Sequence, residues 1–423
     1  MTSKPLLSVC VPSRNRQYYF QHTIRAELQS PHRNVEFIFA DNSDEPAIMN
    51  DFIKSIDDPR MVYLPSEDRV LSMVDNWERC MEACSGDWIV FIGDDDYMDT
   101  DLVLLLDRLM AVEPDTDALH WPPVNYNWPT EEGKIHGTKI VLKEEIFLLH
   151  KSLLENSMFG WKDASHVPHS GFSIYHSAIS RKLMLRIKET FGGLYFEHPI
   201  VDYDNSCKVI ALGQKFAVCP RPFSVMGKCP LSNSAGIGKR DEYRRNISAL
   251  IGEVGRDFET DDAVRDLPFK SLLGTPAVIA QMQHWFKTKY GYEYPNWEVG
   301  FAKACAIDTG YYADQESFDQ AREAYAQAFA SWKGGKYLRH YNPKFIGKRD
   351  AANSIKTGFF ENAVLIEETI GGSRTVGEFF DIVRCMIKPA DMLEINPEGL
   401  RAGRPAPQTL RLNAPLSERR RAS

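Results

Sequence analysis

The stretch Trp88-Ile89-Val90-Phe91-Ile92-Gly93-Asp94-Asp95-Asp96 sets five apolar residues directly before a glycine and three aspartates. Short runs rich in β-branched and aromatic residues are typical of strands. A strand that is apolar at every position is buried on both faces, as happens in a parallel sheet covered by helices. We therefore expect a central strand over 88–92 with acidic side chains at its carboxyl end.

The residues before this strand alternate between two periodicities. Residues 6–11 and 35–40 are two more short apolar runs, and between them apolar side chains recur every four residues from 20 to 28, as on one helix face. The further predicted elements are a strand over 61–64, an amphipathic helix over 71–84 and an apolar helical segment over 102–110. Because parallel strands need such crossover helices, the order predicts an α/β fold with a mainly parallel sheet and helices on both faces.

The composition excludes several classes of protein. The chain has 423 residues, of which 43% are hydrophobic and 26% charged, unlike collagen, coiled coils or disordered chains. This length predicts two or three domains. The 50 Lys and Arg are outnumbered by 58 Asp and Glu, which gives a net charge of -8, so we expect no nucleic-acid partner.

The cysteine and hydropathy patterns favour a cytoplasmic protein. The eight cysteines are scattered, without a C-x-x-C pair or the His spacing of a zinc site, which fits reduced thiols. No run approaches the length of apolar sequence that a membrane-spanning helix needs, and residues 1–10 lack the pattern of a secretion signal.

Polar residues follow three of the predicted strands, at residues 13–15, 41–44 and 93–96. In open α/β sheets, ligands bind at the carboxyl ends of the strands. Adjacent carboxylates repel one another unless a cation or hydrogen bonds neutralise them, and two of them can hold Mg²⁺ or Mn²⁺ together with phosphate oxygens. The sequence therefore predicts a metal–diphosphate site. The alternative is that Asp94 to Asp96 form a polar turn or cap the helix that begins near Asp101.

Four segments resemble, in order and spacing, the successive motifs of family 2 glycosyltransferases. They are SVCVPSRNR (8–16), FADNS (39–43), MVDNW (73–77) and GDWIVFIGDDD (86–96). The resemblance covers roughly the first 230 residues, and ordered motifs are more specific than one acidic triplet. It implies the Rossmann-like GT-A fold, a nucleotide-sugar donor, a divalent cation (Mn²⁺ or Mg²⁺) and inversion at the anomeric carbon.

The resemblance assigns nucleotide-binding roles to the first two loops. Asp41 is expected to contact the base or ribose, since a carboxylate accepts hydrogen bonds from imide N–H groups and hydroxyls. Pro12, Ser13 and Asn15 are expected to shape the same pocket, together with Asp94.

The acidic loop departs from the family pattern at one position. Asp95 matches the metal-binding final acid of the D-x-D motif, and Gly93 replaces its first acid. Either Asp95 and Asp96 hold the metal, which is our prediction, or Asp94 and Asp96 form a shifted pair.

A second acidic segment, Ile200-Val201-Asp202-Tyr203-Asp204, resembles the motif that carries the family's catalytic base, with Val201 in place of the usual Glu. We expect Asp202 to take the proton of the acceptor hydroxyl. The alternatives are that Asp204 is the base, or that both acids only cap the following helix.

Two later stretches are candidates for further contacts. Lys228 lies where relatives close a loop over the donor, and it is expected to contact the diphosphate. The aromatic residues between 121 and 171 suit sugar rings as well as core packing, and core packing is the preferred interpretation.

We predict a glycosyltransferase domain over 1–238, a mostly helical accessory domain over 239–395 and a basic tail over 396–423. Helical patterns recur at 278–285, 318–332, 363–370 and 376–387. The tail carries six arginines after residue 400 and is either solvated or in contact with lipid headgroups at the inner membrane face.

The prediction for function is a metal-dependent inverting glycosyltransferase that moves a sugar from a nucleotide-sugar donor to a glycan or glycolipid acceptor, as in polysaccharide biosynthesis. Two alternatives stay open. One is a catalytically silent relative that binds nucleotide sugar or glycan, which Gly93 and Val201 favour. The other is a sugar nucleotidyltransferase, which would need a glycine-rich loop after the first strand. A homo-oligomer is compatible with each of the three.

Overall fold

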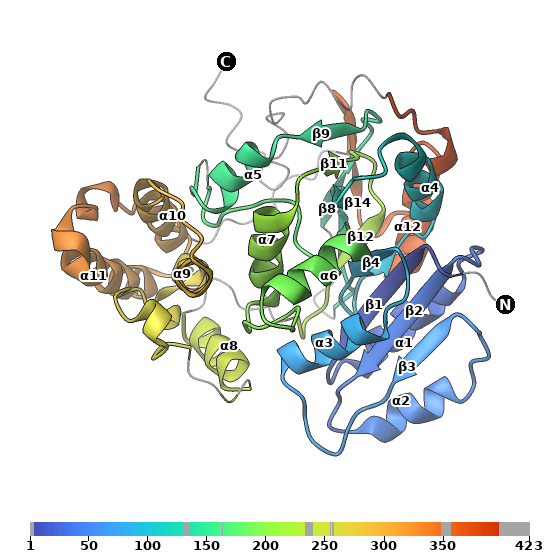
Figure 1. Ribbon diagram of the computed structural model, residues 1–423, viewed down its shortest axis with the longest axis horizontal. Helices are drawn as coiled ribbons and strands as arrows, with labels where there is room; N and C mark the ends of the chain where they lie inside the picture. Colours follow the sequence, from blue (N-terminus) through green and yellow to red (C-terminus); the bar gives the residue numbers. More distant parts are fainter. Residues whose placement is uncertain are drawn as a thin grey trace.

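The structure is a computed structural model, and it describes residues 4–130, 136–162, 164–232, 240–253, 255, 258–347 and 357–396. Its centre is an eight-stranded sheet in the order β3-β2-β1-β4-β10-β6-β11-β9 (Figure 1). The strands are β1 (Leu7–Ser13), β2 (Val35–Asp41), β3 (Met61–Leu64), β4 (Trp88–Phe91), β6 (Ala118–His120), β9 (Phe147–Leu149), β10 (Ser177–Ser180) and β11 (Phe216–Val218). The first four strands are parallel to one another, and the predicted α/β class is confirmed.

Helices cover both faces of this sheet because successive strand residues point to opposite sides. In β1, Val9 packs with one apolar cluster and Cys10 with another, and neither side chain is exposed. The helices of the Val9 side are α1 (Gln17–Leu28), α2 (Pro46–Ile53) and α4 (Leu102–Val112), and those of the Cys10 side are α3 (Met73–Ala83), α6 (Arg181–Thr190) and α7 (Val201–Leu212). The predicted strands and the predicted first helices are therefore confirmed.

Two small sheets lie beside the large one. The first has the order β5-β12-β7, with β5 (Tyr97–Met98), β7 (Val124–Asn127) and β12 (Ser224–Lys228). The second has the order β13-β14-β8, with β8 (Gly137–Val141), β13 (Gly358–Phe360) and β14 (Ala363–Glu367). The helix expected over 363–370 is wrong: Glu361, with φ 51°, turns the chain between β13 and β14, and β14 pairs along its length with β8.

The helical patterns of the second half form a separate layer, drawn in yellow and orange at the left of Figure 1. It comprises α8 (Arg240–Gly252), α9 (Thr275–Tyr290), α10 (Glu298–Gly310) and α11 (Gln315–Ser331), with α5 (Lys151–Met158) beside it. Phe269, Phe301 and Phe329 meet edge to face or tilted within it. Trp161 joins this layer to the rest of the molecule, since its indole N–H donates to Gln283 of α9 at 2.8 Å.

The last described residues return to the sheet. Helix α12 (Val376–Arg384) lies against α1, with the Cα of Gly377 close to Ala26. Further along, the guanidinium of Arg108 on α4 donates to the carbonyl oxygen of Asp391 at 2.9 Å. Residues 357–395, which we assigned to the helical domain, thus contact helices α1 and α4 and strand β8.

Two further parts of the sequence analysis concern membranes and the tail. Among the described residues, no helix combines the length and apolar character that crossing a bilayer requires. The basic stretch from residue 397 onward lies outside the described residues.

Candidate active site

The loops that follow β1 and β2 are tied together at the edge of the sheet. Ser13 and Asp41, the last residues of these strands, stand opposite each other in the register. Asn15 is exposed and has φ 57°, a conformation that asparagine tolerates better than most residues. Its side-chain amide donates to Asp44 at 2.8 Å and its side-chain oxygen accepts from the Asp44 N–H at 2.9 Å. The two loops therefore form one rim.

Asp94 joins the acidic loop to this rim. The Ser13 hydroxyl donates to Asp94 Oδ2 at 2.6 Å, and Arg16 Nη2 lies 2.7 Å from Asp94 Oδ1. Burial raises the pKa of Asp94 to about 7, although the Arg16 charge opposes this shift. The three polar clusters predicted from the sequence thus meet at one edge of the sheet.

Asp95 and Asp96 have different surroundings. Asp95 Oδ2 accepts from the Ser232 hydroxyl at 2.8 Å and from the Cys229 N–H at 3.1 Å, while Asp95 Oδ1 lies 3.4 Å from Arg16 Nη1. Both oxygens of Asp96 accept backbone N–H groups, those of Gly227 and Gly93, each at 2.7 Å. Burial, followed by the Asp95 charge, raises the pKa of Asp96.

These contacts decide which oxygens could meet a cation. Four of the six carboxylate oxygens accept hydrogen bonds from protein groups other than Arg16, and the two others, Asp94 Oδ1 and Asp95 Oδ1, both face Arg16. Within the described ranges, no group of three His, Cys, Asp or Glu side chains forms a ligand set. Two carboxylates fit Mg²⁺ or Mn²⁺, which complete their shells with water and substrate phosphates. The donor set therefore fits such an ion through Asp94 and Asp95, and Asp96 is held by the backbone.

Two glycines allow the acidic loop to pack closely. A Cβ at Gly93 would lie 3.0 Å from Asp95 Oδ1 and 3.1 Å from Asp96 Oδ2, so an acid at this position would crowd the two carboxylates. A Cβ at Gly227 of β12 would lie 1.7 Å from the Asp95 carbonyl oxygen. The replacement of the family's first acid by Gly93 therefore has a local steric reason.

Asp202 lies in the first turn of α7. Its Oδ1 accepts the Tyr203 N–H at 2.9 Å. Burial raises the pKa of Asp202 to about 6. The link to the acidic loop is Tyr175, because after burial the charges of Asp202 and Asp96 are the largest causes of the raised pKa of this phenol. The charges of Asp202 and of the acidic loop thus act on the same tyrosine.

The neighbours of Asp202 are structural. Val201 is 3% exposed and belongs to the main core. Asp204 is fully buried, pairs with Lys208 at 3.0 Å and accepts the Glu197 N–H at 2.9 Å. Of the two acids in this turn, Asp202 alone is partly exposed.

The remaining predicted residues are spread along the same edge. Pro12 is buried within β1, beside Ala40 in the register. Asp41 is fully buried, and its Oδ1 accepts the Ser43 hydroxyl at 2.6 Å. Lys228 ends β12 with an exposed side chain, between the two residues whose N–H groups hold Asp95 and Asp96.

The aromatic residues proposed for sugar contacts are mostly core. Trp121, Tyr126, Trp128 and Trp161 are at most 2% exposed. The Trp128 indole N–H donates to the Asp95 carbonyl oxygen at 2.9 Å, so Trp128 supports the backbone of the acidic loop. Core packing, the preferred interpretation, agrees with these exposures.

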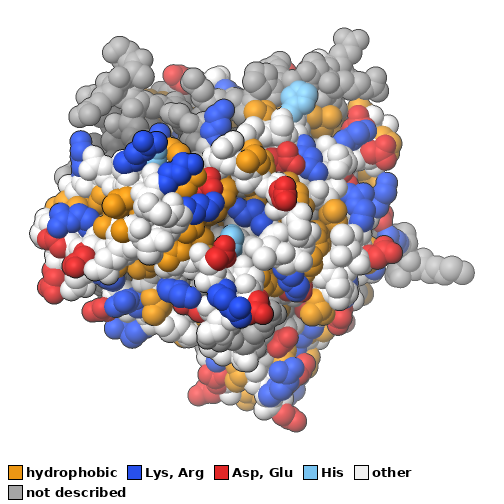
Figure 2. Space-filling model, turned by 60° about the vertical axis from the view of Figure 1, so that its left-hand side comes forward, with side chains coloured by type: hydrophobic (Ala, Val, Ile, Leu, Met, Phe, Trp, Pro, Cys, Tyr) orange, Lys and Arg blue, Asp and Glu red, His pale blue; other side chains and the backbone are white. Residues whose placement is uncertain are grey.

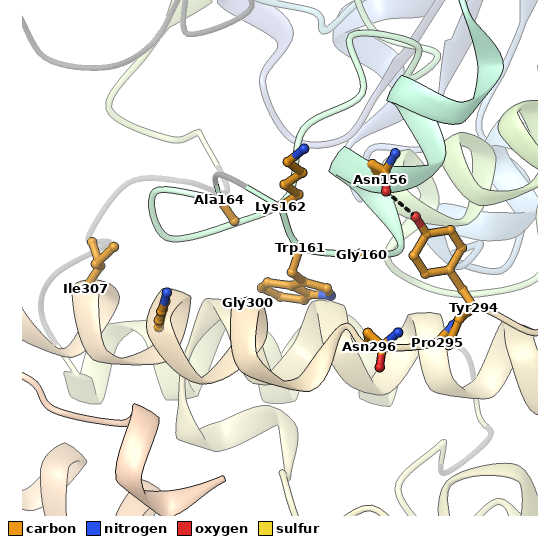
Figure 3. Close-up of a pocket in the computed structure, with 11 residues that line it drawn as sticks. Asn156, Gly160, Trp161, Lys162, Ala164, Tyr294, Pro295, Asn296, Gly300 and Ile307 are labelled. Atoms are coloured by element: carbon orange, nitrogen blue, oxygen red, sulfur yellow. Dashed lines mark hydrogen bonds between the residues drawn. The ribbon is translucent and has the colours of Figure 1, made fainter.

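A hollow of about 660 Å³ lies between the end of α5 and α10, away from the acidic loop (Figure 3). Trp161, Lys162 and Lys303 line it, and the Tyr294 hydroxyl donates to Asn156 at 2.6 Å across its rim. Figure 2 shows the side of the molecule that carries the helical layer, where basic, acidic and apolar side chains are interspersed.

Sequence reasoning missed two residues of the site, Arg16 and Tyr175. Arg16 was quoted only as part of a motif, although an arginine close to the end of a rim strand is the natural partner of an acidic loop on the same rim. Tyr175 lies outside every quoted motif, and only its bridge to Phe91 places it near the carboxyl end of β4.

The model of the family described as Glycosyl transferase family 2 matches residues 8–183. No curated protein matches the chain. Among solved structures, S. aureus TarS 1-349 in complex with UDP-GlcNAc is 12% identical, over 79% of this chain and 89% of that chain, with a TM-score of 0.40. S. aureus TarS is 11% identical, over 79% of this chain and 54% of that chain, with a TM-score of 0.38. The likeness to glycosyltransferase family 2 therefore rests on the family model, which matches residues 8–183, and on the four motifs that these residues contain.

Proposed function

We propose that this chain transfers a sugar, with inversion, from a nucleotide-sugar donor to a hydroxyl group of a glycan or lipid-linked glycan. The observation that carries the proposal is that Asp94 Oδ1 and Asp95 Oδ1, in the loop after β4, both face the guanidinium of Arg16. A further carboxylate, Asp202, is near enough to the acidic loop that its charge and that of Asp96 both raise the pKa of Tyr175. Asp94 and Asp95 are thus available to hold the cation that meets the leaving diphosphate, and Asp202 is available to take the proton of the attacking hydroxyl.

Asp94 and Asp95 would hold a divalent cation, Mn²⁺ or Mg²⁺. When bound, such an ion neutralises the charge that develops on the departing diphosphate. Asp96 would instead fix the loop, because its two oxygens accept the N–H groups of Gly93 and Gly227. This revises the prediction that Asp95 and Asp96 form the metal pair.

The rim formed by the loops after β1 and β2 would bind the nucleotide. Asn15 is exposed there and Ser13 positions Asp94, while Asp41 lies below with its carboxylate held by Ser43. Lys228 is exposed and stands between Gly227 and Cys229, whose N–H groups support the acidic loop, and we retain it as a diphosphate contact.

Asp202 would remove the proton from the acceptor hydroxyl. A base needs a pKa close to the working pH to be both ionised and proton-accepting, and burial raises the pKa of Asp202 to about 6. Its Oδ1 is held by the Tyr203 N–H, which fixes the direction of the carboxylate. Asp204 is engaged with Lys208 and is not suited to this role.

A panel of nucleotide sugars, each incubated with glycan acceptors with and without Mn²⁺, tests the proposal. We expect release of a nucleoside diphosphate from one donor, and loss of at least a hundredfold in rate in Asp202→Asn. The matched control is Asp241→Asn, which changes an exposed acid in the first turn of α8 and should keep the rate.

The same panel distinguishes the alternatives. Equal and negligible turnover in the wild type and in Asp202→Asn, with donor binding intact, would favour the silent relative. Release of inorganic pyrophosphate from a nucleoside triphosphate and a sugar phosphate would favour a nucleotidyltransferase.

We also propose that the enzyme works in the cytoplasm. All eight cysteines are free thiols, and seven of them are buried, which suits a reducing compartment. Contact of the basic tail with the inner membrane face stays a prediction.

A further inference from the structure

Arg16 stands directly before α1, at the position where its guanidinium meets the acidic loop. Nη2 lies 2.7 Å from Asp94 Oδ1 and Nη1 lies 3.4 Å from Asp95 Oδ1. The Asp94 side chain is fully buried and that of Asp95 is 7% exposed, whereas the Arg16 side chain is 19% exposed. This cation is therefore bound to the two oxygens that have no other protein partner among the described residues.

These two oxygens are also the ones that would hold a divalent cation. A guanidinium and a divalent ion a few Å apart in a poorly hydrated site repel each other strongly. Asp94 and Asp95 can therefore bind either Arg16 or the divalent ion, but not both. For the ion to bind, Arg16 must move away and find a new partner.

A diphosphate is such a partner. Guanidinium groups form forked hydrogen bonds with phosphate oxygens, and a donor bound at the rim would bring its diphosphate beside Asp94 and Asp95. Arg16 belongs to the loop between β1 and α1, which borders this space, and its side chain is partly open to solvent.

We propose that Arg16 is an internal counter-cation that closes the Asp94–Asp95 site to divalent ions in the donor-free enzyme and moves to the diphosphate when the donor binds. This inference rests on the proposed function. It makes Arg16 a positioning residue that sets the order of binding, so that the divalent cation is taken up with the donor and not before it.

Arg14 provides a matched control from the same loop. Its guanidinium pairs with Glu253 at 2.5 Å and lies 3.7 Å from Asp44, and none of its contacts described here involves the acidic loop. Arg14→Gln removes the same charge two residues away, without removing a partner of Asp94 or Asp95.

The test measures Mn²⁺ binding to the full chain by electron paramagnetic resonance of free Mn²⁺, with no nucleotide present. We expect Arg16→Gln to bind Mn²⁺ at least tenfold more tightly than the wild type, and Arg14→Gln to bind it as the wild type does. Adding Asp95→Asn to Arg16→Gln should abolish the gain.

A second arm repeats the titration with inorganic pyrophosphate, subtracting protein-free blanks that contain the same Mn²⁺ and pyrophosphate. Pyrophosphate should improve Mn²⁺ binding to the wild type at least tenfold and to Arg16→Gln less than threefold. Equal Mn²⁺ affinity of the wild type and Arg16→Gln, or a gain that survives Asp95→Asn, would overturn the inference.

Thermal melting checks that Arg16→Gln is folded, because this variant leaves Asp94 buried without a cation. If Arg16→Gln is not folded, Arg16→Lys is used in its place. A single ammonium group should hold the two carboxylates less firmly than the guanidinium, so we expect this variant to bind Mn²⁺ two- to fivefold more tightly than the wild type. An unchanged affinity would count against the inference. Absence of sugar transfer by the wild type would defeat the proposed function and leave these binding comparisons standing.

Discussion

Only Tyr203 separates Asp202 from Asp204 in the sequence. Their environments nevertheless predict opposite effects on stability when each is changed to asparagine. Asp202 is partly exposed and has no cation among its described contacts. Asp204 is fully buried against Lys208, which is itself 0% exposed. A buried carboxylate without a cationic partner, as a catalytic base needs to be, should lower the free energy of unfolding. Removing a carboxylate that pairs with a buried cation should instead destabilise the protein.

The magnitude for Asp202 follows from its pKa. Burial raises this pKa from 3.8 to about 6, and a shift of about two units corresponds to about 3 kcal/mol. A raised pKa in the folded state penalises ionisation: the penalty is absent below pH 3.8, grows through pH 6 and is complete above it. Because the side chain is partly solvated, we expect Asp202→Asn to stabilise the protein by about 1–3 kcal/mol at pH 7.5 and hardly at all at pH 4.

Asp204→Asn should act in the opposite direction. It leaves the buried Lys208 with Glu197, 3.2 Å away, as its only remaining described acidic partner. It also weakens the acceptor for the Glu197 and His198 N–H groups. Breaking a buried ion pair on one side costs about 3 kcal/mol or more.

Urea denaturation followed by tryptophan fluorescence, at pH 7.5 and pH 4, measures both effects. Asp241→Asn serves as the control, with an expected change of less than about 0.5 kcal/mol because its carboxylate is solvated. A destabilised Asp202→Asn, or a gain that is the same at both pH values, would refute the assignment of Asp202 as a carboxylate held in an unfavourable environment.

Three further outcomes are expected. The transfer rate should fall about tenfold between pH 7.5 and pH 5, as Asp202 with its pKa of about 6 is protonated, and a pH–rate profile of kcat measures this. Gly227→Ala should abolish transfer and Mn²⁺ binding while circular dichroism stays unchanged, because its Cβ would stand 1.7 Å from the Asp95 carbonyl oxygen and displace the acidic loop. Asp99→Ala should lower the free energy of unfolding by about 3–5 kcal/mol, since Asp99 neutralises Arg221 at 2.9 Å and Arg384 at 3.2 Å; a loss below 1 kcal/mol by urea titration would contradict this.

The order of strands and helices up to β4 could be predicted because each element there satisfies its own periodicity. Residues 37–40 and 88–91 are apolar at every position and are buried on both sides of the sheet. Strand ends in a parallel sheet point to one edge, so the polar residues after them had to meet. The sequence therefore predicts that Ser13 and Asp94, far apart in the chain, lie at the same edge, and their hydrogen bond agrees with this.

The division of labour within the acidic triplet could not be predicted. It depends on N–H groups of Gly227 and Cys229, which come from a strand more than a hundred residues later. The periodicity of apolar residues, two in a strand and 3.6 in a helix, gives no information on which distant backbone N–H group will reach a given carboxylate. The expectation that Asp95 and Asp96 hold the metal came from the resemblance to the D-x-D motif, and a motif does not reveal such backbone partners.

The segment 363–367 illustrates the same limit for secondary structure. Its apolar run is short enough to suit a helix or a strand. The choice is made by pairing with Gly137 to Val141, more than two hundred residues earlier. Tertiary contact therefore decides where the local pattern is ambiguous.

The return of α12 to α1 bears on how this protein is made. During synthesis the amino-terminal sheet emerges first, and Val376, Phe379, Phe380 and Val383, all fully buried in the finished protein, follow only after the helical layer. Until then, the apolar surface that receives them around Tyr126 and Val225 is open to the ribosome's surroundings. Residues up to 383 must therefore be synthesised before this apolar surface is covered, so we expect chains truncated before α12 to depend on chaperones and to be degraded early.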